Sequence, residues 1–419
     1  MSIERRRVLM VAFHFPPMAG SSGIQRSLRF VQHLPSQGWD PIVLSAHPRV
    51  YDRTADDLLA QVPTNVPVHR AFALDTARHL SIGGRYPGAL ARPDRWSSWL
   101  VGAIPSGLAL IRRYRPDVIW STYPIATAHR IALTLHKLSD IPLVLDFRDP
   151  MAQEGYPADP RTWRSFAQID REAVRFASKL VFVTPGCQRL YRERYPQTDS
   201  GRFALIENGF DEEAFLDAER DRPSEALNPG RLTILHSGIV YPSERDPSAL
   251  FGALGRMLSA GRIDATTLRI RFRAPLHSDL LERLAAQTGT RSLIEILPAV
   301  PYREALREMM CSDSLLVMQG ANCHDQIPAK LYEYFRAKRP ILGLADPTGD
   351  TGVCMLRCGV RQVVPLEDTV RVEDALERHI SDLRSDAFAA SSPAHIATMS
   401  RRARSQALAD LLTHVARGD

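Results

Sequence analysis

Residues 8–44, VLMVAFHFPPMAGSSGIQRSLRFVQHLPSQGWDPIVL, decide the fold class of this chain. An uninterrupted apolar run at 8–13 is followed by a loop with Gly20 and Gly23, and a second apolar run closes the stretch at 42–44. Between them, apolar residues recur every three or four positions, which is typical of one face of a helix. The order strand, glycine loop, helix and strand predicts a βαβ unit.

The same alternation continues along the chain. Short apolar runs alternate with segments of helical periodicity such as 125–138 and 163–177. Strands that are apolar on both faces are typical of a parallel sheet covered by helices on both sides. The further predicted strands lie at 118–120, 143–145, 180–183, 204–206, 232–235, 268–272, 293–297, 315–318, 341–344 and 362–364.

An acidic, loop-like stretch at 211–230 interrupts this alternation. It is typical of a connection between domains, because it lacks the apolar periodicity that a packed element needs. We therefore predict an α/β protein with two doubly wound, Rossmann-like domains at 1–215 and 216–395. A final segment at 396–419 contains a further predicted helix.

Composition excludes several classes of protein. The chain has 419 residues, 44% of them hydrophobic, which is enough to bury the cores of two domains. Its net charge of +6 is small for this length, and it favours an anionic small substrate or a membrane surface over nucleic acid. The five cysteines form no C-x-x-C pair, which argues against a disulfide framework or a zinc site and favours the cytoplasm.

Neither a secretory signal nor a membrane-spanning helix is predicted. The apolar run at 8–13 is too short for the core of a signal peptide. The longest other apolar stretch, 99–111, contains Pro105 and is shorter than the roughly 20 residues that a spanning helix needs.

The glycine loop after the first strand does not have the G-x-G-x-x-G spacing of a dinucleotide site. The second strand also lacks a following acid that could bind a ribose hydroxyl, so a dehydrogenase is disfavoured. Gly20 and Gly23 could still let the backbone approach an anion at the positive end of the following helix. Alternatively, they serve only a tight turn between strand and helix.

The densest group of polar side chains lies in residues 325–340, DQIPAKLYEYFRAKRP. Pro328 is typical of a first helical position, which would place Lys330 in the first turn. Lys330 and Glu333 are three residues apart and share a face of this helix. The lysine could bind a diphosphate and the carboxylate two ribose hydroxyls; alternatively, the two form an ordinary surface ion pair.

These features, in their order along the chain, resemble the retaining family 4 glycosyltransferases of GT-B fold. The resemblance covers most of the chain and rests on residues 15–17 with the glycine loop, 146–150, 206–211 with Phe215, 236–238 and 330–334. It implies two Rossmann-like domains that face each other across a cleft. The acceptor site would lie in the first domain and the nucleotide-sugar site in the second, with the segment 396–419 packed back on the first domain.

The resemblance also implies which residues bind the donor. Glu333 matches the second acid of the family pattern and would bind the donor. Asp325 takes the place of the first acid, which is usually Glu, and is our candidate catalytic residue just before this helix. After the glycine matched by Gly238, the family usually has an Arg, where this chain has Ile239. A Lys that usually follows is approximated by Arg245, one residue late. Lys330 is our candidate for the missing phosphate contact.

Two further groups of site residues come from the resemblance. Arg148 and Asp149 follow the strand at 143–145, where the family often has a catalytically important polar residue. The alternative is that Arg148 pairs with Asp146 or Asp149 only to hold the loop. Val300 would lie near the base of the nucleotide, or alternatively belong to the core.

The predicted function is a metal-independent transfer of a sugar from a nucleoside-diphosphate sugar to a hydroxyl acceptor, without a cofactor. No D-x-D sequence occurs, which argues against the metal-dependent GT-A type. The expected acceptor is a glycan or a lipid-linked molecule, in the assembly of cell-surface polysaccharide or glycan. Arginines at 5–7 and 401–404 suggest peripheral contact with an anionic membrane, at its cytoplasmic face. A sugar-nucleotide epimerase and a catalytically degenerate partner subunit are the alternatives.

Overall fold

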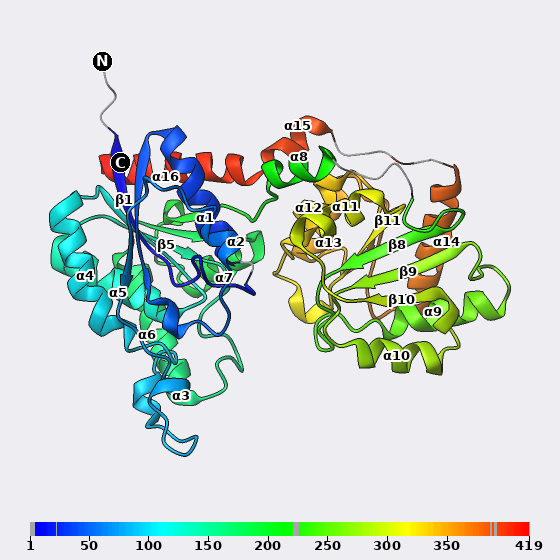
Figure 1. The fold of residues 1–419 in the computed structure, drawn as a ribbon, viewed down its shortest axis with the longest axis horizontal. Helices are drawn as coiled ribbons and strands as arrows, with labels where there is room; N and C mark the ends of the chain where they lie inside the picture. The colour runs from blue at the N-terminus through cyan, green and yellow to red at the C-terminus, as the bar shows by residue number, and fades with distance from the viewer. Residues whose placement is uncertain (1–4, 22, 221–225, 386–387, 389–391, 419) are drawn as a thin grey trace. The chain divides into compact units, whose positions relative to one another are not determined.

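The structure, a computed structural model, consists of two compact units (Figure 1). The N-terminal unit comprises Met1–Asn208 together with Arg401–Asp419, and the C-terminal unit comprises Gly209–Ser400. Each has its own parallel sheet and its own hydrophobic cores. The structure describes residues 5–21, 23–220, 226–385, 388 and 392–418.

A seven-stranded sheet in the order β3-β2-β1-β4-β5-β6-β7 forms the centre of the N-terminal unit. All of its neighbouring strands are parallel, and Val8 of β1 lies opposite both Pro41 of β2 and Val118 of β4. The strands are β1 (Arg6–Val11), β2 (Trp39–Ala46), β3 (Val68–Ala71), β4 (Val118–Thr122), β5 (Leu143–Phe147), β6 (Lys179–Phe182) and β7 (Phe203–Leu205).

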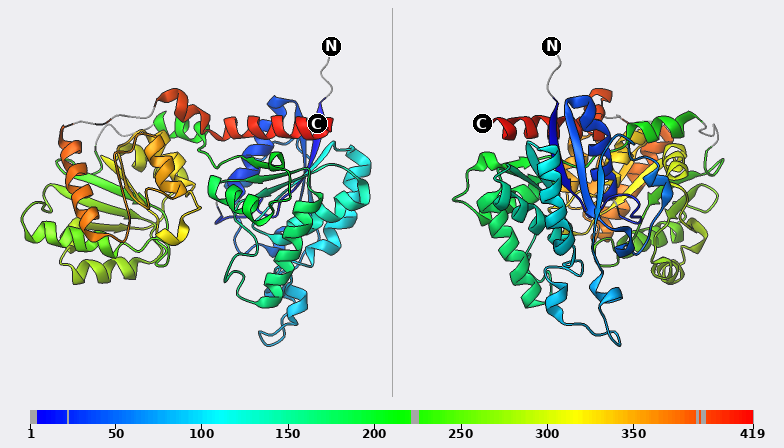
Figure 2. Two further views of the ribbon diagram at one scale, coloured as in Figure 1. Left: turned by 180° about the vertical axis from the view of Figure 1, so that it is seen from behind. Right: turned by 60° about the vertical axis from the view of Figure 1, so that its left-hand side comes forward.

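Helices cover both faces of this sheet. Because successive side chains of a strand point to opposite faces, Leu9 and Val11 pack with one set of helices and Val8 and Met10 with another. The first set comprises α4 (Trp99–Tyr114), α5 (Ala126–Ser139), α6 (Pro160–Phe176) and α7 (Pro185–Arg194), and the second α1 (Gly23–His33) and α16 (Arg401–Arg417). Two short helices, α2 (Asp56–Leu59) and α3 (Thr76–His79), lie in the connections. Figure 2 shows α16 from behind, on the N-terminal unit.

The C-terminal unit repeats this plan with a six-stranded parallel sheet in the order β10-β9-β8-β11-β12-β13. Its strands are β8 (Leu232–Ser237), β9 (Leu268–Arg273), β10 (Ile294–Leu297), β11 (Ser314–Met318), β12 (Ile341–Leu344) and β13 (Gln362–Val364). Its helices are α8 (Glu212–Arg220), α9 (Ser248–Ser259), α10 (Ser278–Gln287), α11 (Tyr302–Cys311), α12 (Lys330–Ala337), α13 (Asp350–Arg357), α14 (Thr369–Ser385) and α15 (Pro393–Thr398).

The predicted architecture of two doubly wound, Rossmann-like domains is confirmed. In both sheets the chain starts in the middle, builds outward to one edge and then returns to build the other. The direction therefore reverses between β1 and β4 in one sheet and between β8 and β11 in the other. In such sheets, ligands bind beyond the carboxyl ends of the strands at this reversal. Among the described residues, no helix is long and apolar enough to cross a membrane.

The unit boundaries differ from those predicted from the sequence. The chain enters the C-terminal unit at Gly209 rather than after residue 215, because Phe210 and Phe215 pack in a core with Leu235 and Leu331. It leaves again after Ser400 rather than at residue 396, because α15 belongs to that same core. The predicted linker at 211–230 therefore contains helix α8, and part of it lies outside the described residues.

Candidate functional site

The predicted donor residues gather at the reversal point of the C-terminal sheet. Gly238 follows β8, and α12 begins at Lys330 after the neighbouring strand β11. The backbone of Gly238 has a φ of +114°, and a Cβ atom there would lie 3.0 Å from Nζ of Lys330. Glycine is therefore needed twice, for its backbone conformation and for the close approach of the lysine.

Lys330 is held by a histidine that the sequence analysis did not assign to the site. Nζ of Lys330 lies 3.1 Å from Nε2 of His236, and Nδ1 of His236 lies 3.0 Å from the carbonyl oxygen of Leu316. Because a carbonyl oxygen only accepts, we assign the proton of the imidazole to Nδ1, so that Nε2 accepts from the lysine. Burial, with the charge of Lys330, keeps the pKa of His236 well below its ordinary value.

The surroundings of Lys330 disfavour the charged form of its amino group. Burial of its ammonium group and the nearby charge of Arg245 lower its pKa to about 7, and Glu333 opposes this shift. Nη1 of Arg245 donates to the carbonyl oxygen of Ile239 at 3.1 Å. Lys330 and Arg245 thus bring two cationic groups to one strand end, where an anion would relieve their mutual repulsion.

Tyrosines orient the neighbouring polar groups. The hydroxyl of Tyr302 donates to Oε1 of Glu333 at 2.8 Å, and the hydroxyl of Tyr334 accepts from the backbone N–H of Ser237 at 2.9 Å. Tyr334 is fully buried and thus fixes the end of β8 against α12. Glu333 keeps its place on the same helix as Lys330, as the three-residue spacing predicts.

The other two predicted residues of this unit lie in different surroundings. Asp325 is half-buried in a turn five residues before α12, whose N-terminal cap is Ala329 rather than Asp325. Val300 follows β10, two strands away from β8, and lines a cavity of about 300 Å³ together with Arg273 and Glu308. Among the described residues, Val300 is thus grouped with Arg273 and Glu308 rather than with Lys330.

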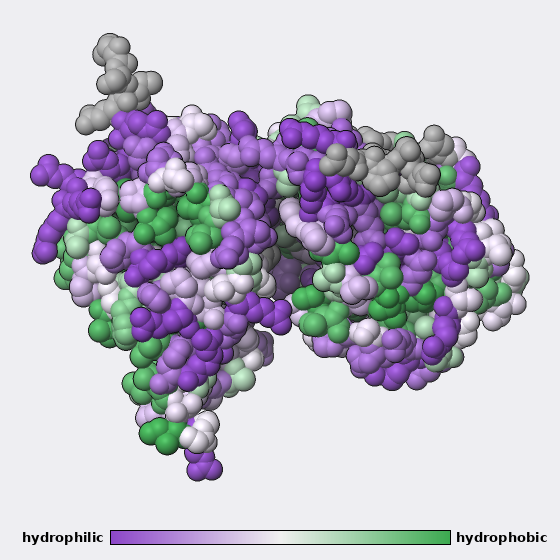
Figure 3. Space-filling view, viewed as in Figure 1, coloured by the Kyte–Doolittle hydropathy of each residue, from purple (hydrophilic) through white to green (hydrophobic). Residues whose placement is uncertain are grey.

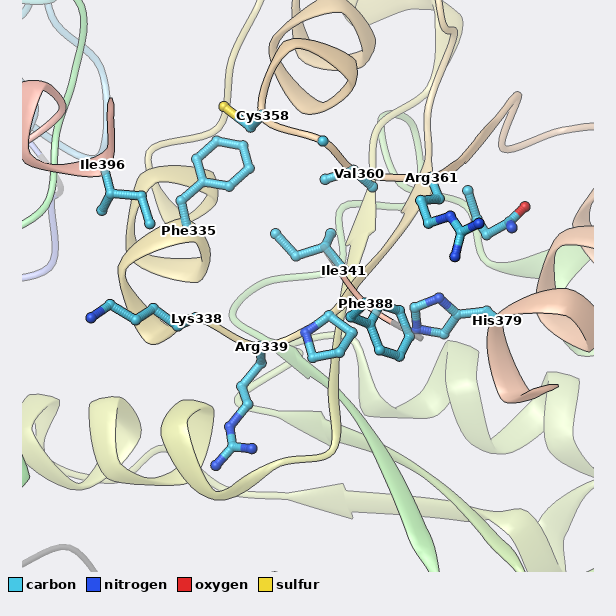
Figure 4. Close-up of a pocket in the computed structure, with 13 residues that line it drawn as sticks. Phe335, Lys338, Arg339, Ile341, Cys358, Val360, Arg361, His379, Phe388 and Ile396 are labelled. Atoms are coloured by element: carbon cyan, nitrogen blue, oxygen red, sulfur yellow. The ribbon is translucent and has the colours of Figure 1, made fainter. Parts of the chain in front are cut away.

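A second cavity, of about 280 Å³, lies at the opposite edge of the sheet (Figure 4). Ile341 and Gln362, which line it, are the first residues of β12 and β13. Figure 4 shows that the side chains of Lys338 and Arg339 point away from Ile341, whereas His379 and Arg361 lie on another side of the cavity. Since ligands of such sheets bind at the carboxyl ends of the strands, we assign this cavity no part of the donor site.

In the N-terminal unit, the glycine loop and the loop after β5 come together. A Cβ atom on Gly23, the first residue of α1, would overlap the guanidinium of Arg148 and lie 2.8 Å from Nδ1 of His14. Oγ of Ser21 lies 3.0 Å from the same Nδ1, and burial with the charge of Arg148 lowers the pKa of His14 to about 3. Gly20 has a φ of +84° at the turn.

Asp146 and Asp149 differ in their surroundings. The carboxylate of Asp146 is buried and accepts two hydrogen bonds from Arg26, at 2.7 and 2.9 Å, and one from Oγ1 of Thr122 at 2.9 Å. Asp149 is exposed. Arg26 is thus a buried ion-pair partner of Asp146, and the charges of Asp149 and Asp146 also act on the guanidinium of Arg148.

Comparison with known proteins supports the fold and the family of the N-terminal unit. Residues 22–209 match the family model of the glycosyl transferase 4-like domain. No curated protein matches the sequence. Among solved structures, HepE from Anabaena in complex with UDP and glucose has a TM-score of 0.60 at 13% identity, with 99% of this chain and 98% of that chain covered.

Two other solved structures have the same fold. WaaG, a glycosyltransferase involved in lipopolysaccharide biosynthesis, has a TM-score of 0.58 at 13% identity, with 98% of both chains covered. A Listeria monocytogenes protein assigned as a UDP-N-acetylglucosamine 2-epimerase has a TM-score of 0.58 at 10% identity, with 99% of this chain and 98% of that chain covered. At such low identity these likenesses concern the fold. Residues 22–209 thus resemble the glycosyl transferase 4-like domain, and the chain has the GT-B fold.

Proposed function

We propose that this chain is a retaining glycosyltransferase of the hexosyltransferase type. It would transfer a sugar from a nucleoside-diphosphate sugar to a hydroxyl group of an acceptor. The observation that carries this proposal is the pair of cationic groups, Lys330 and Arg245, at the carboxyl end of β8 and the start of α12. The complex of HepE with UDP and glucose supports a nucleotide-sugar donor.

The chemistry of the proposed reaction needs a group that stabilises the departing diphosphate. Negative charge grows on the leaving oxygen in the transition state, and the ammonium of Lys330 is oriented by His236 toward the strand end where we place the phosphates. Arg245 supplies a second cation, so the reaction would need no metal ion. Glu333 would bind the ribose hydroxyls and Asp325 the donor sugar.

The acceptor and the cellular role are inferred more indirectly. We propose that Arg148 and Asp149, at the carboxyl end of β5, are catalytic residues, and that Gly20 and Gly23 let the backbone approach an anionic group of the donor. A glycan or lipid-linked acceptor in the assembly of cell-surface polysaccharide fits the role of WaaG, which is involved in lipopolysaccharide biosynthesis. A cytoplasmic protein in peripheral contact with an anionic membrane would meet such an acceptor.

Nucleotide binding and product analysis test the proposal. Thermal shift with nucleoside diphosphates and their sugars would identify the donor, since a ligand of the folded state raises the melting temperature. Lys330→Gln should abolish that shift, whereas Lys338→Gln, the same change at the exposed end of α12, should preserve it. Failure of every nucleoside diphosphate to bind would contradict the proposed donor site.

The same purified protein distinguishes the rival functions. Incubation with the identified donor and a glycan acceptor should give a glycoside with retained anomeric configuration and a free nucleoside diphosphate. Release of an epimerised nucleotide sugar would instead establish the epimerase, which shares this fold. Binding of the donor with neither product would favour a degenerate partner subunit.

A further inference from the structure

One loop of the N-terminal unit exposes apolar side chains among basic ones. Residues 76–93, which we call the basic loop, contain three arginines and one histidine but no Asp or Glu. Within it, Ile82 is 88% exposed, Leu90 is 44% exposed and Tyr86 is 38% exposed. The loop extends from the end of the N-terminal unit around α3 (Figure 1), and apolar and polar surface lie side by side at its tip (Figure 3).

The basic loop has a defined structure, so this exposure is not a consequence of fraying. At its tip, Ile82 and Arg85 exchange two backbone hydrogen bonds of 2.9 and 3.1 Å across Gly83 and Gly84. Both glycines have positive φ angles, as a tight two-residue hairpin turn requires. The turn thus presents Ile82 to solvent.

The base of the loop is fixed to the body of the unit. The buried carboxylate of Asp75 caps α3 by accepting from the N–H groups of Ala77 and Arg78, and it pairs with Arg95 at 3.2 Å. Oγ1 of Thr76 donates to the carbonyl oxygen of Leu90 at 2.8 Å, which ties the two arms together. The loop therefore projects as a pre-formed element.

Two exposed aromatic side chains lie near the start of α6, at positions 156 and 163. Tyr156 is 56% exposed and Trp163 is 38% exposed, and Nε1 of Trp163 donates to the carbonyl oxygen of Gln153. Hydrogen bonds from Thr162 and, to a smaller extent, the charge of Arg92 lower the pKa of Asp159 at the start of α6, which places Arg92 near this segment. Ile, Tyr, Trp and Arg together are the side chains that enter the boundary between lipid headgroups and acyl chains.

We propose that the basic loop docks on an anionic lipid bilayer, with Ile82 inserted among the lipids and Arg85 and Arg92 beside their phosphates. Charge complementarity selects this partner, because residues 76–93 contain no carboxylate. Arg78 pairs with Asp52 at 3.0 Å, so the proposal assigns the lipid phosphates to Arg85 and Arg92. This inference rests on one part of the proposed function, the peripheral contact with an anionic membrane. It does not depend on the proposed sugar transfer.

Three of the arginines that first indicated a membrane contact form contacts within the N-terminal unit. Arg5 pairs with Asp40 at 2.8 Å, Arg6 donates to the carbonyl oxygen of Thr413 at 3.0 Å, and Arg404 pairs with Glu207 at 2.7 Å. These contacts hold the N-terminal unit together. We therefore place the proposed docking surface at the basic loop rather than at these three arginines.

Sedimentation of the full chain with lipid vesicles tests this inference. We expect binding to vesicles of phosphatidylcholine with phosphatidylglycerol, but not to phosphatidylcholine alone, and a decrease when the salt is raised from ~0.05 to ~0.5 M. Ile82→Asp and Arg85→Glu should each lower the partition coefficient roughly tenfold. Val370→Asp, at a 68% exposed apolar residue of α14 in the other unit, and Arg5→Gln should leave it unchanged.

The outcomes separate the loop from the proposed function. Equal binding of Ile82→Asp, Arg85→Glu and the unaltered protein would overturn the docking role of the loop while leaving a membrane contact in place. Absence of vesicle binding by the unaltered protein would overturn both the docking role of the loop and the proposed membrane contact. It would not bear on the proposed sugar transfer. An unchanged melting temperature and unchanged nucleoside diphosphate binding show that each variant is folded, because neither side chain is buried.

Discussion

The ammonium nitrogen of Lys330 lies 3.1 Å from Nε2 of His236, and the other ring nitrogen of that histidine is bound to a backbone carbonyl of β11. With its proton assigned to Nδ1, the neutral histidine accepts from the lysine through Nε2. Because His236 and Lys330 are 94 residues apart in the chain, only the folded sheet brings them together. This contact aims the lysine at the end of β8.

The lowered pKa of Lys330 predicts a pH-dependent affinity. A bound diphosphate favours the ammonium form, so binding takes up a proton when the pH is above about 7, the pKa of the free lysine. We expect the dissociation constant for a nucleoside diphosphate to rise by up to about tenfold per pH unit above that value. Calorimetry between pH 6 and 9 in buffers of different ionisation enthalpy measures both effects. Lys330→Gln should remove the proton uptake; its persistence in that variant would assign it to another group.

The same pKa shift predicts a change in stability. The pKa of Lys330 is about 7 in the folded chain and 10.5 as an unperturbed value, so the unfolded state binds more protons between these values. The contribution of Lys330 to the free energy of unfolding should therefore rise with pH across this window and be lost as the pH falls to about 7. Urea unfolding of the unaltered chain and of Lys330→Gln should give curves that diverge only in this range.

Gly238→Ala should weaken both the fold and the donor site. The φ of +114° disfavours any side chain, and the new methyl group would lie 3.0 Å from Nζ of Lys330. We expect a loss of about 1–3 kcal/mol in the free energy of unfolding together with weaker nucleoside diphosphate binding. Gly230→Ala is the matched control, since its φ is +79° and no atom lies within 4 Å of the new methyl group. Equal binding by both variants would show that Lys330 does not contact the ligand.

Asp325 and Glu333 should affect different steps. Glu333→Gln should chiefly raise the dissociation constant of the donor, because the carboxylate is proposed to bind ribose. Asp325→Ala should lower turnover far more than affinity, because it would act on the transition state. A loss of activity in Asp325→Ala could not be attributed to a lost helix cap, since the N-terminal cap of α12 is Ala329. Steady-state kinetics with the melting temperature decide: an active but less stable Asp325→Ala enzyme contradicts the catalytic role.

Arg26 and Asp146 should matter for stability as a pair. Their side chains are only 4% and 1% exposed, so Arg26→Met leaves a buried carboxylate without its partner. We expect this change to lower the free energy of unfolding by about 3–5 kcal/mol. The double variant Arg26→Met, Asp146→Leu should recover much of that loss, and Asp149→Asn, at an exposed position, should change it by no more than about 0.5 kcal/mol. A nearly unaffected Arg26→Met would mean that the ion pair contributes little.

The buried strands could be predicted from the sequence because a short, uninterrupted apolar run is typical of a strand that is covered on both faces. Strand β3 was missed because His69 and Arg70 interrupt its apolar pattern, as an edge strand permits. Helix α12 begins two residues after Pro328, since the backbone first makes a turn there. Lys330 nevertheless keeps the first-turn place that was predicted.

Long-range pairings could not be predicted in the same way. Arg26 and Asp146 are 120 residues apart, and no local pattern distinguishes this arginine from its neighbours. Likewise, no local pattern links His236 to Lys330, which lies 94 residues away in the chain. The sequence identified which strand ends carry polar residues, whereas the partners of those residues depend on the topology of the sheet.

The N-terminal unit is not continuous in sequence, and this has a consequence for its biosynthesis. Helix α16 covers the sheet beside α1, and Nε1 of Trp39 donates to Oγ1 of Thr413, 374 residues later. During translation, the part of this face that α16 covers, beside α1, therefore stays exposed until α16 leaves the ribosome. The C-terminal unit, whose residues are contiguous, can close its own cores earlier, so the half of the protein made first is the half completed last.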